Sequence, residues 1–388
     1  MEKKKSLFKD ELTLLVHKIC IDYINNVDYR PEFKELLEYV ELIISNLYDK
    51  AFIKKNIYIE ILSQYILYQF RDYCDNYNHF IENDNTKIVD ELKNIPYIEQ
   101  RSNEWFKLKE DSIGASESAA IFNKSAFCSK NELLLKKCGL KKNNSIATSH
   151  ACLHGTKYEP VVQLLYEINK QVKLNEFGSL LHPEFEMVSA SPDGITDKGI
   201  MIEIKVPIKR KITGIPPIYY WIQMQQQMQV CNLDQVHYVE CKISEYLNKD
   251  AYFKDILNLE SMDEPFNSNG FYKNCIIEFH NLEKDDVGWI YPEKFMNNKE
   301  LLKWEKDMQN TLRNTTNKLY SRTIYWKIEE FSISPIWRDD IWWNNNKHLY
   351  TEFWGEVTHY RKVGYESLIK NYKKPAMKRN KCLIIEDK

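Results

Sequence analysis

The sequence predicts an α/β (α+β) fold with a central mixed β-sheet flanked by helices, extended at the N-terminus by a helical segment. Three observations predict this class. Amphipathic helical patterns fill the first 80 residues, and the order helix, hairpin, helix, strand follows between residues 154 and 243. The 43% hydrophobic and 28% charged residues are ordinary for a folded protein. Together they indicate a packed α/β core rather than disorder.

Residues 1–95 are predicted to form a helical N-terminal domain of unknown role. Apolar residues recur at three-and-four spacing in residues 30–48, where Pro31 suits a first helical turn, and residues 57–74 are a second helix candidate. The polar stretch 82–98 is interpreted as a linker or a short connecting helix, so the domain boundary is placed there.

Residues 96–370 are predicted to form the main domain, followed by a flexible basic tail at residues 371–388. The helices expected in the main domain span residues 115–123, 130–140, 154–170, 219–231, 298–312 and 339–370. The expected strands span residues 185–190, 200–206, 236–243, 274–281 and 323–337.

Composition excludes several classes of protein. The sequence has no run of about 18 apolar residues that could cross a membrane, and its lysine-rich start lacks the apolar core of a signal peptide. The nine cysteines show no spacing typical of zinc ligands or a disulfide framework, which favours reduced thiols inside the cell. The net charge of -2 does not point to a partner, so a DNA-binding hypothesis must depend on local features.

The stretch from Ser191 to Pro207 carries charges within an otherwise apolar hairpin. Because side chains alternate along a strand, the isoleucines of residues 200–206 share the core face, while Glu203 and Lys205 share the opposite face. Asp193 lies in a Pro-Asp-Gly corner, and the short connection after it brings Asp193 back toward Glu203.

Two carboxylates beside a lysine predict a site for a hard divalent cation. Mg²⁺ takes oxygen ligands and keeps several waters, and a neighbouring lysine can orient a metal-activated water. The alternative is an exposed antiparallel hairpin in which an acid and a base form a weak surface ion pair.

Asp193, Glu203 and Lys205 match the PD-(D/E)xK nuclease signature, and residues 101–243 resemble the lambda exonuclease or YqaJ-like viral recombinase family. The resemblance implies a restriction-endonuclease-like core. It also implies that Asp193 and Glu203 are metal ligands, that the main-chain carbonyl of Ile204 is a further ligand, and that Lys205 is the catalytic lysine.

The resemblance assigns a 5′-phosphate site to residues from two further motifs. Lys109, where the family usually has arginine, and Ser116 match its first motif, and Ser191 precedes the Pro-Asp-Gly corner. Lysine keeps the positive charge but loses the bidentate geometry of arginine. For Ser116, a helix N-cap or a small packing residue is an equal alternative.

Two helices complete the resemblance. Glu159 matches the acidic residue of the family's GxxxE helix and is expected to line the metal site from the opposite side, although a surface glutamate is the alternative. Gln223 matches the glutamine of the YxxQxQ helix that reaches the active site. Residues 226–229 are assigned to the polar outer face of that helix.

The loop after the strand carries Lys209, Arg210 and Lys211. Such a cluster at the mouth of a nuclease site could grip the DNA backbone, but a solvated loop is an equal interpretation.

By this resemblance the protein is a Mg²⁺-dependent deoxyribonuclease, with Mn²⁺ as a substitute, that resects double-stranded DNA ends from 5′ to 3′. The expected partners are a single-strand annealing protein and further copies of the chain in a trimer. A large DNA virus and cytoplasmic replication sites are the expected setting. The alternatives are an endonuclease of the same fold and a catalytically silent DNA-end-binding scaffold. An iron–sulfur nuclease is disfavoured because the cysteines are not clustered.

Overall fold

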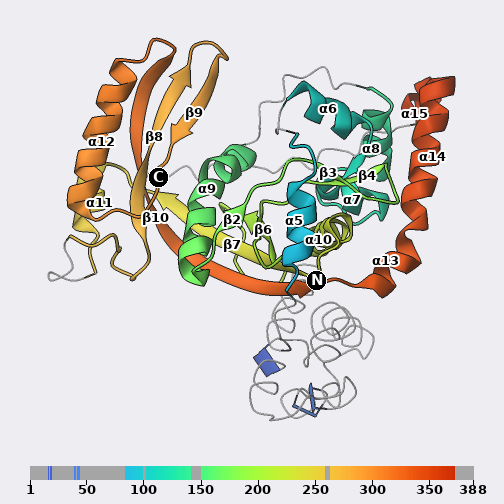
Figure 1. Ribbon diagram of the computed structural model, residues 1–388, viewed down its shortest axis with the longest axis horizontal. Coiled ribbons are helices and arrows are strands. Elements are labelled where there is room, and N and C mark those ends of the chain that lie inside the picture. Colours follow the sequence, from blue (N-terminus) through green and yellow to red (C-terminus); the bar gives the residue numbers. More distant parts are fainter. Residues whose placement is uncertain are drawn as a thin grey trace, which may run out of the picture.

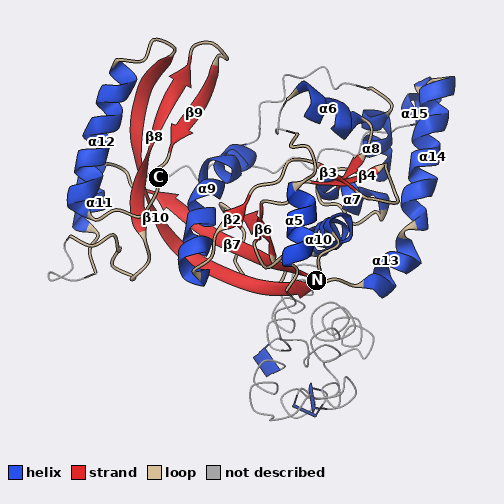
Figure 2. Cartoon of the chain, in the orientation of Figure 1, coloured by secondary structure: helices blue, strands red, loops and turns tan. Residues whose placement is uncertain are grey.

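The computed structural model describes residues 84–98, 102–140, 150–257 and 263–371, together with isolated residues at 16, 18–19, 39–40 and 42–43. Figure 1 gives the arrangement of the elements and Figure 2 their type. The two helices predicted between residues 30 and 74, and the basic tail after residue 371, lie outside the described residues.

The described helices are α5 (Thr86–Lys93), α6 (Asn103–Glu110), α7 (Ala115–Ile121), α8 (Lys130–Lys137), α9 (His150–Lys170), α10 (Ile218–Cys231), α11 (Lys249–Lys254), α12 (Asn298–Arg313), α13 (Asp340–Asn346), α14 (His348–Val363) and α15 (Glu366–Asn371). The described strands are β1 (Ile113–Gly114), β2 (Leu174–Asn175), β3 (Leu180–Leu181), β4 (Val188–Ala190), β5 (Gly194–Thr196), β6 (Met201–Lys205), β7 (Gln235–Glu245), β8 (Lys273–Asn281), β9 (Asp286–Ile290) and β10 (Lys318–Trp337).

A seven-stranded mixed sheet with the order β2-β5-β6-β7-β10-β8-β9 forms the centre of the molecule. Strands β6 and β7 run parallel, joined by the crossover helix α10, while the neighbouring pairs in this sheet run antiparallel. A smaller sheet, β1-β4-β3, lies beside it. The predicted mixed α/β class, with helices flanking a central sheet, is confirmed.

Strand β6 is covered on both faces. Ile202, Ile204 and Val206 pack with the apolar residues of α9, whereas Met201 belongs to a second core cluster that contains the apolar residues of α10. The prediction that the isoleucines face the core is therefore confirmed. The opposite face, which carries Glu203, is not an open surface because α10 lies against it, and Glu203 is only 1% exposed.

The outer-face assignment for residues 226–229 is wrong for Gln226 and Gln227, whereas Gln229 does lie near the surface and donates to Asp340. Gln225, Gln226 and Gln227 are fully or almost fully buried. The Gln226 amide donates to the carbonyls of Ile113 and Ser189, each at 2.8 Å. A buried amide is tolerated when it is hydrogen-bonded, and here these bonds tie α10 to β1 and β4.

Helix α5 packs against the main sheet next to the β5–β6 turn and is hydrogen-bonded to that turn. Val89 and Leu92 of α5 are buried in the same core cluster as Met201. The Asn85 amide before α5 donates to the Lys198 carbonyl in the turn. Gly199 takes φ +86°, a left-handed conformation that favours glycine. Residues 86–93, within the segment assigned to the N-terminal domain, thus pack against the main sheet.

The 20-residue strand β10 links two parts of the sheet. Its C-terminal half pairs with β7 and its N-terminal half with β8, with register shifts at Tyr320/Arg322 and Ile328/Glu330. Figure 1 shows β10 curving from the β8–β9 pair, where α12 lies alongside, toward the end that leads into α13. The helical stretch predicted at 339–370 is divided into α13, α14 and α15, with Gly364 at φ +90° after α14.

Candidate active site

The β5–β6 hairpin places Asp193 opposite Glu203. The register pairs Gly194 with Ile202 and Ile195 with Met201, so the residue before β5 faces Glu203. The Ile204 amide donates to Oδ2 of Asp193 at 2.7 Å. The local sequence thus produces the first carboxylate pair, because the short turn between β5 and β6 fixes the register.

Glu203 is held by side chains of two elements. On β6, Lys205 Nζ donates to Oε1 of Glu203. From α10, Gln223 Nε2 donates to Oε1 at 2.6 Å and Gln227 Nε2 donates to Oε2 at 2.7 Å. Gln223 and Gln227 are one helical turn apart and so reach both oxygens of one carboxylate. Gln223 was predicted to reach this site, whereas Gln227 was missed.

Helix α9 approaches the same hairpin from the other face of the sheet. Gln163, one turn after Glu159, donates its amide to the Asp193 carbonyl at 2.7 Å. The charge of Glu159 acts on Asp193. Gln163 was not predicted, although its i+4 spacing from Glu159 is visible in the sequence.

Two other carboxylates act electrostatically on Asp193. Burial, Glu203 and Glu159 raise the pKa of Asp193 well above its usual range, while Lys205 and the Ile204 amide act in the opposite direction. Burial alone would lower the pKa of Lys205, but Glu203 and Asp193 outweigh it and the pKa is raised. Lys205 is therefore an ammonium group whose Nζ also lies 4.6 Å from the ring centroid of Tyr220.

Ser116 and Ser191 follow strands β1 and β4 at the same end of the small sheet. Strands β1 and β4 run parallel with Gly114 paired to Ser189, and each serine follows two residues later. Ser191 Oγ lies 3.0 Å from Ser179 Oγ, and Ser116 is exposed. The N-cap of α7 is Gly114, so Ser116 is not the cap that the alternative interpretation requires.

Lys109 lies in a basic cluster on α6, seven residues before Ser116. Its Nζ is 4.2 Å from the Trp105 ring centroid. Burial lowers the pKa of Lys109, Glu117 raises it, and Lys136 and Lys137 lower it. Lys136 and Lys137 pair with Glu117, whose charge also acts on Lys109, so three lysines share one glutamate and net positive charge is left.

The basic loop is divided by the structure. Lys209 and Lys211 are exposed, but Arg210 pairs with Glu240 of β7, and its Nη2 donates to the Tyr238 hydroxyl at 3.3 Å. Glu240 is fully buried and was missed by the sequence analysis. The side chains of residues 236–243 alternate between the two faces of the strand, as those of β6 do. This alternation was the signal in the sequence that could have identified Glu240. The pairing of Lys205 with Glu240 across β6 and β7 brings this second ion pair beside the site.

The donors of this site suit a hard cation. The available groups are carboxylate and carbonyl oxygens. Burial and then carboxylate repulsion raise the pKa of Asp193, and a divalent cation would relieve that repulsion. Within the described part of the chain, no three carboxylate, imidazole or thiol groups form a cluster that could hold an ion by themselves. A bound Mg²⁺ would therefore take further ligands from water, as Mg²⁺ usually does.

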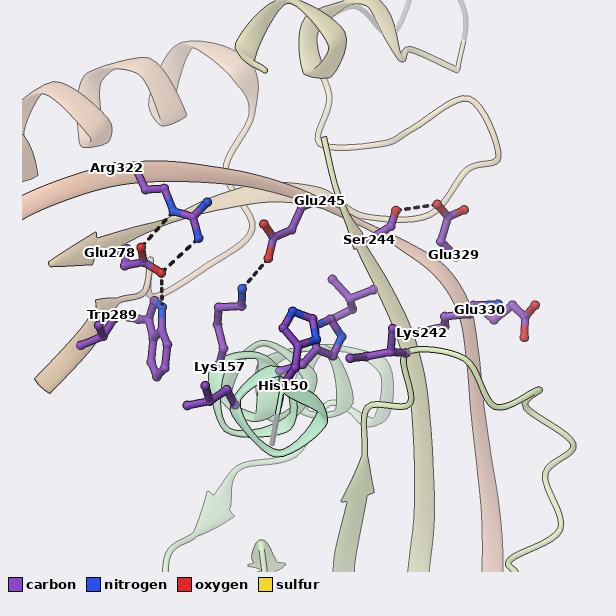
Figure 3. A pocket seen from close by; sticks show the side chains of 15 residues that line it. His150, Lys157, Lys242, Ser244, Glu245, Glu278, Trp289, Arg322, Glu329 and Glu330 are labelled. Atoms are coloured by element: carbon purple, nitrogen blue, oxygen red, sulfur yellow. Dashed lines mark hydrogen bonds and ion pairs between the residues drawn. The ribbon is translucent and has the colours of Figure 1, made fainter. Parts of the chain in front are cut away.

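A cavity of about 790 Å³ lies between the N-terminal part of α9 and the strands β7 to β10. Figure 3 shows that two of its cations point to carboxylates, Lys157 to Glu245 and Arg322 to Glu278. Asp193, Glu203 and Lys205 do not line it. This cavity is lined by both cations and carboxylates and is separate from Asp193 and Glu203, so it is not the candidate reaction centre.

A comparison with protein-family models matches residues 104–234 to the YqaJ-like viral recombinase domain. This part of the chain therefore resembles the YqaJ-like viral recombinase domain. The match spans Glu159, Asp193, Glu203, Lys205 and Gln223. The resemblance drawn from the sequence is thus confirmed, and a YqaJ-like domain with this residue set supports a nuclease in general.

Similar proteins occur in large DNA viruses. "Uncharacterized protein R354" of Acanthamoeba polyphaga mimivirus is 29% identical over 318 residues, which cover 73% of this chain and 56% of R354. A protein of African swine fever virus is 26% identical over 246 residues, covering 54% of this chain and 69% of that viral protein. The chain therefore spans only about half of R354.

Two solved structures are similar to this chain at low identity. An alkaline exonuclease (LHK-Exo) from Laribacter hongkongensis is 18% identical, with a TM-score of 0.41, and the match covers 70% of this chain and all of that one. A phage related exonuclease from Haemophilus somnus 129PT is 12% identical with a TM-score of 0.33, and the match covers 67% of this chain and 96% of that one.

Among the described residues, no helix is both long and apolar enough to span a membrane.

Proposed function

We propose that the protein is a Mg²⁺-dependent deoxyribonuclease that resects double-stranded DNA ends in the 5′-to-3′ direction. The observation that carries the proposal is the convergence of Asp193, Glu203 and Lys205 at the β5–β6 hairpin, inside the YqaJ-like domain. A binding module would gain nothing from buried carboxylates next to a phosphate, since they repel it.

The proposed chemistry is hydrolysis of a phosphodiester bond. Mg²⁺ at Asp193 and Glu203, with the Ile204 carbonyl and Glu159 as further donors and Mn²⁺ as a substitute, would supply Lewis-acid activation. Lys205, held as an ammonium, donates hydrogen bonds to the attacking water or to a phosphate oxygen and stabilises developing negative charge. Gln223 keeps Glu203 in place.

A preference for DNA ends is supported by the residues that are proposed to bind the 5′ phosphate. Ser116 and Ser191 come just after two neighbouring parallel strands, at the same end of the small sheet. Ser191 also precedes Asp193 by two residues. Lys109, with its neighbouring lysines, adds positive charge on the element before β1. A terminal phosphate has more charge than an internal one, so this arrangement favours an end.

The test compares a linear duplex carrying 5′ phosphates with a covalently closed circle of the same sequence, each with Mg²⁺ and with Mn²⁺. We expect nucleotides to be released from 5′ ends of the linear DNA alone. Lys205→Ala and Asp193→Ala should abolish release while DNA binding persists. Lys173→Ala, a change of an exposed lysine paired with Glu167, is the matched control and should act as wild type.

The rival functions make different predictions in the same assay. Equal cutting of the closed circle would establish an endonuclease. If the wild-type protein hydrolyses no DNA with either metal but binds DNA ends tightly, the protein is a DNA-end-binding scaffold and not a nuclease.

The expected product, a duplex with 3′ single-stranded tails, is what a single-strand annealing protein would use. That partner, a trimeric assembly and action at cytoplasmic replication sites remain predictions. Light scattering of the purified chain, with and without DNA, measures the assembly.

A further inference from the structure

Three aromatic rings form a continuous path from solvent to the candidate catalytic lysine. Phe127 lies in the α7–α8 loop, and its ring centroid is 5.3 Å from that of Tyr219 and 6.4 Å from that of Tyr220. The rings of Tyr219 and Tyr220, at the start of α10, are 4.5 Å apart. We call these three residues the aromatic ladder.

The inner end of the ladder lies at the reaction centre. Lys205 Nζ is 4.6 Å from the ring centroid of Tyr220, and the Arg210 guanidinium carbon is 5.9 Å from it. Lys205 in turn donates to Glu203. A group resting on the ladder would therefore be close to a phosphate that lies at Glu203.

The outer end is presented to solvent by a fixed loop. Phe127 is 70% exposed, which is uncommon for so large an apolar ring. Its backbone is held in place, because the amides of Phe127 and Cys128 donate to the Ser125 hydroxyl at 3.1 and 3.3 Å. The ring is thus exposed although its loop is hydrogen-bonded, and packing alone does not explain a phenylalanine there.

Positive charge lies next to the ladder. Arg210, anchored by buried Glu240, lies over Tyr220, and exposed Lys209 and Lys211 flank Arg210 in the chain. An aromatic surface bordered by cations matches a nucleotide, which has an apolar base face and an anionic phosphate.

We propose that Phe127 and Tyr219 form a stacking platform for the base of an unpaired terminal nucleotide of the DNA strand whose phosphate lies at Asp193 and Glu203. This inference rests on the proposed function. A base inside a duplex is already stacked on both sides and a paired terminal base is fixed by its partner, whereas an unpaired terminal base can rotate out and lay a face on the ladder. The platform therefore favours ends whose terminal pair is open.

The test measures binding in a chelator, where no hydrolysis occurs. The probes are two duplexes with a 5′-terminal 2-aminopurine, one with a mismatched terminal pair and one fully paired. Stacking on Phe127 should quench the fluorescence of the mismatched probe. Phe127→Ala should remove the quenching and weaken binding of that probe by about 10-fold, the scale of one base stacked on an aromatic ring, with a smaller effect on the paired probe.

Two further variants separate stacking from folding. Phe127→Trp keeps a stacking surface and should retain quenching and affinity. Phe271→Ala, a change of another exposed phenylalanine at the approach to β8, should leave both unchanged. Because the Phe127 ring is mostly exposed, the melting temperature of Phe127→Ala should stay within about 2 °C of wild type.

The outcomes for the platform and the nuclease are distinguishable. Equal quenching and affinity in wild type and Phe127→Ala would overturn the platform, even if the protein hydrolyses DNA with Mg²⁺. Quenching that depends on Phe127 in a protein that hydrolyses no DNA would support the platform and refute the nuclease.

Discussion

Glu203 shows how much of the site depends on single hydrogen bonds. Its buried carboxylate accepts bonds from Lys205, Gln223 and Gln227, so both oxygens are held. Burying a carboxylate is tolerated only when donors replace the water that it loses. The two glutamines therefore hold the proposed metal ligand Glu203 in position.

Gln227→Leu should release one oxygen of Glu203. We expect kcat to fall about 10- to 100-fold, the usual effect of losing a group that orients a metal ligand, and the free energy of unfolding to fall by about 1–3 kcal/mol. Steady-state kinetics and urea denaturation measure the two effects. Gln229→Leu, on the same helix but bonded to Asp340 near the surface, should change neither by a comparable amount.

Asp193→Asn should stabilise the metal-free protein at pH 8. The raised pKa means that the fold favours the protonated carboxyl, so the stability that it contributes is complete below the unfolded pKa of about 3.9 and is lost as the pH rises through the folded value. Asparagine removes that charge and can still accept the Ile204 bond. The expected gain is on the order of 1 kcal/mol at pH 8 and near zero at pH 4.

Urea denaturation in a chelator measures the Asp193→Asn effect at each pH, and a Mg²⁺ titration of the melting temperature provides the functional readout. Wild type should be stabilised by Mg²⁺ and the variant should not. A variant that is less stable than wild type at pH 8 would show that Asp193 is not under electrostatic repulsion.

The sequence predicted the residues whose partners are near in the chain. Asp193, Glu203 and Lys205 lie within one hairpin, where two-residue alternation and a short turn determine which side chains share a face. Gln227 was missed because its partner Glu203 lies on another element, and no local pattern distinguishes a buried glutamine from a surface one. Glu240 was missed although the alternation along β7 was visible, because its ion pair with Arg210 joins two elements. Burial by tertiary packing decided both.

At the scale of elements, the β5–β6 hairpin determines the register of the carboxylates. Its turn closes at Gly199, whose amide donates to the Thr196 carbonyl at 2.9 Å. A Cβ at Gly199 would lie 2.5 Å from the Asn85 Cβ, too close for the turn and α5 to keep their positions. The turn thus couples α5 to the site.

Gly199→Ala should destabilise the protein by about 2–3 kcal/mol, because alanine is strained at φ +86° and clashes with Asn85. The melting temperature and the nuclease rate should both fall. Gly155→Ala is the control, since Gly155 lies inside α9 with no atom within 4 Å of the added Cβ. It should raise stability by up to about 1 kcal/mol. Equal effects of both substitutions would argue against a constrained turn.

Most elements were predictable because their hydrophobic periodicity is strong. The boundaries of α9, α10 and α12 follow from it within a few residues. The division of residues 340–371 into three helices was not predicted, since the left-handed Gly364 and the break at Lys347 interrupt an otherwise continuous pattern. The pairing of β10 with both β7 and β8 also could not be read from sequence, because pairing partners depend on the whole sheet.

At the scale of the molecule, the part built on β8, β9 and α12 has its own buried charge. Lys273 is fully buried and donates to the carbonyls of Tyr252 at 2.7 Å and Asp255 at 2.6 Å. Burial lowers the pKa of Lys273 to about 8, against the attraction of Asp255. An ammonium in this position opposes folding at neutral pH.

Between pH 8 and about 10.5 the unfolded chain keeps a proton on Lys273 that the folded chain has released, so wild-type stability should rise with pH in that window. Lys273→Met removes this titration. The stability of wild type relative to the variant should therefore increase by about 3 kcal/mol from pH 7.5 to 10.5, as measured by urea denaturation at several pH values. Parallel curves would show that Lys273 has an ordinary pKa in the fold.

Strand β10 has a consequence for how the two parts of the sheet come apart. Trp326 and Lys327 pair on one side with Glu245 and Ser244 and on the other with Asn274 and Lys273. Amide hydrogens at this crossing are covered by both parts, so they exchange with deuterium only when both open. The carboxylate cluster and the β8–β9 extension then share one opening event, and the slowest-exchanging amides of the molecule are expected at this crossing.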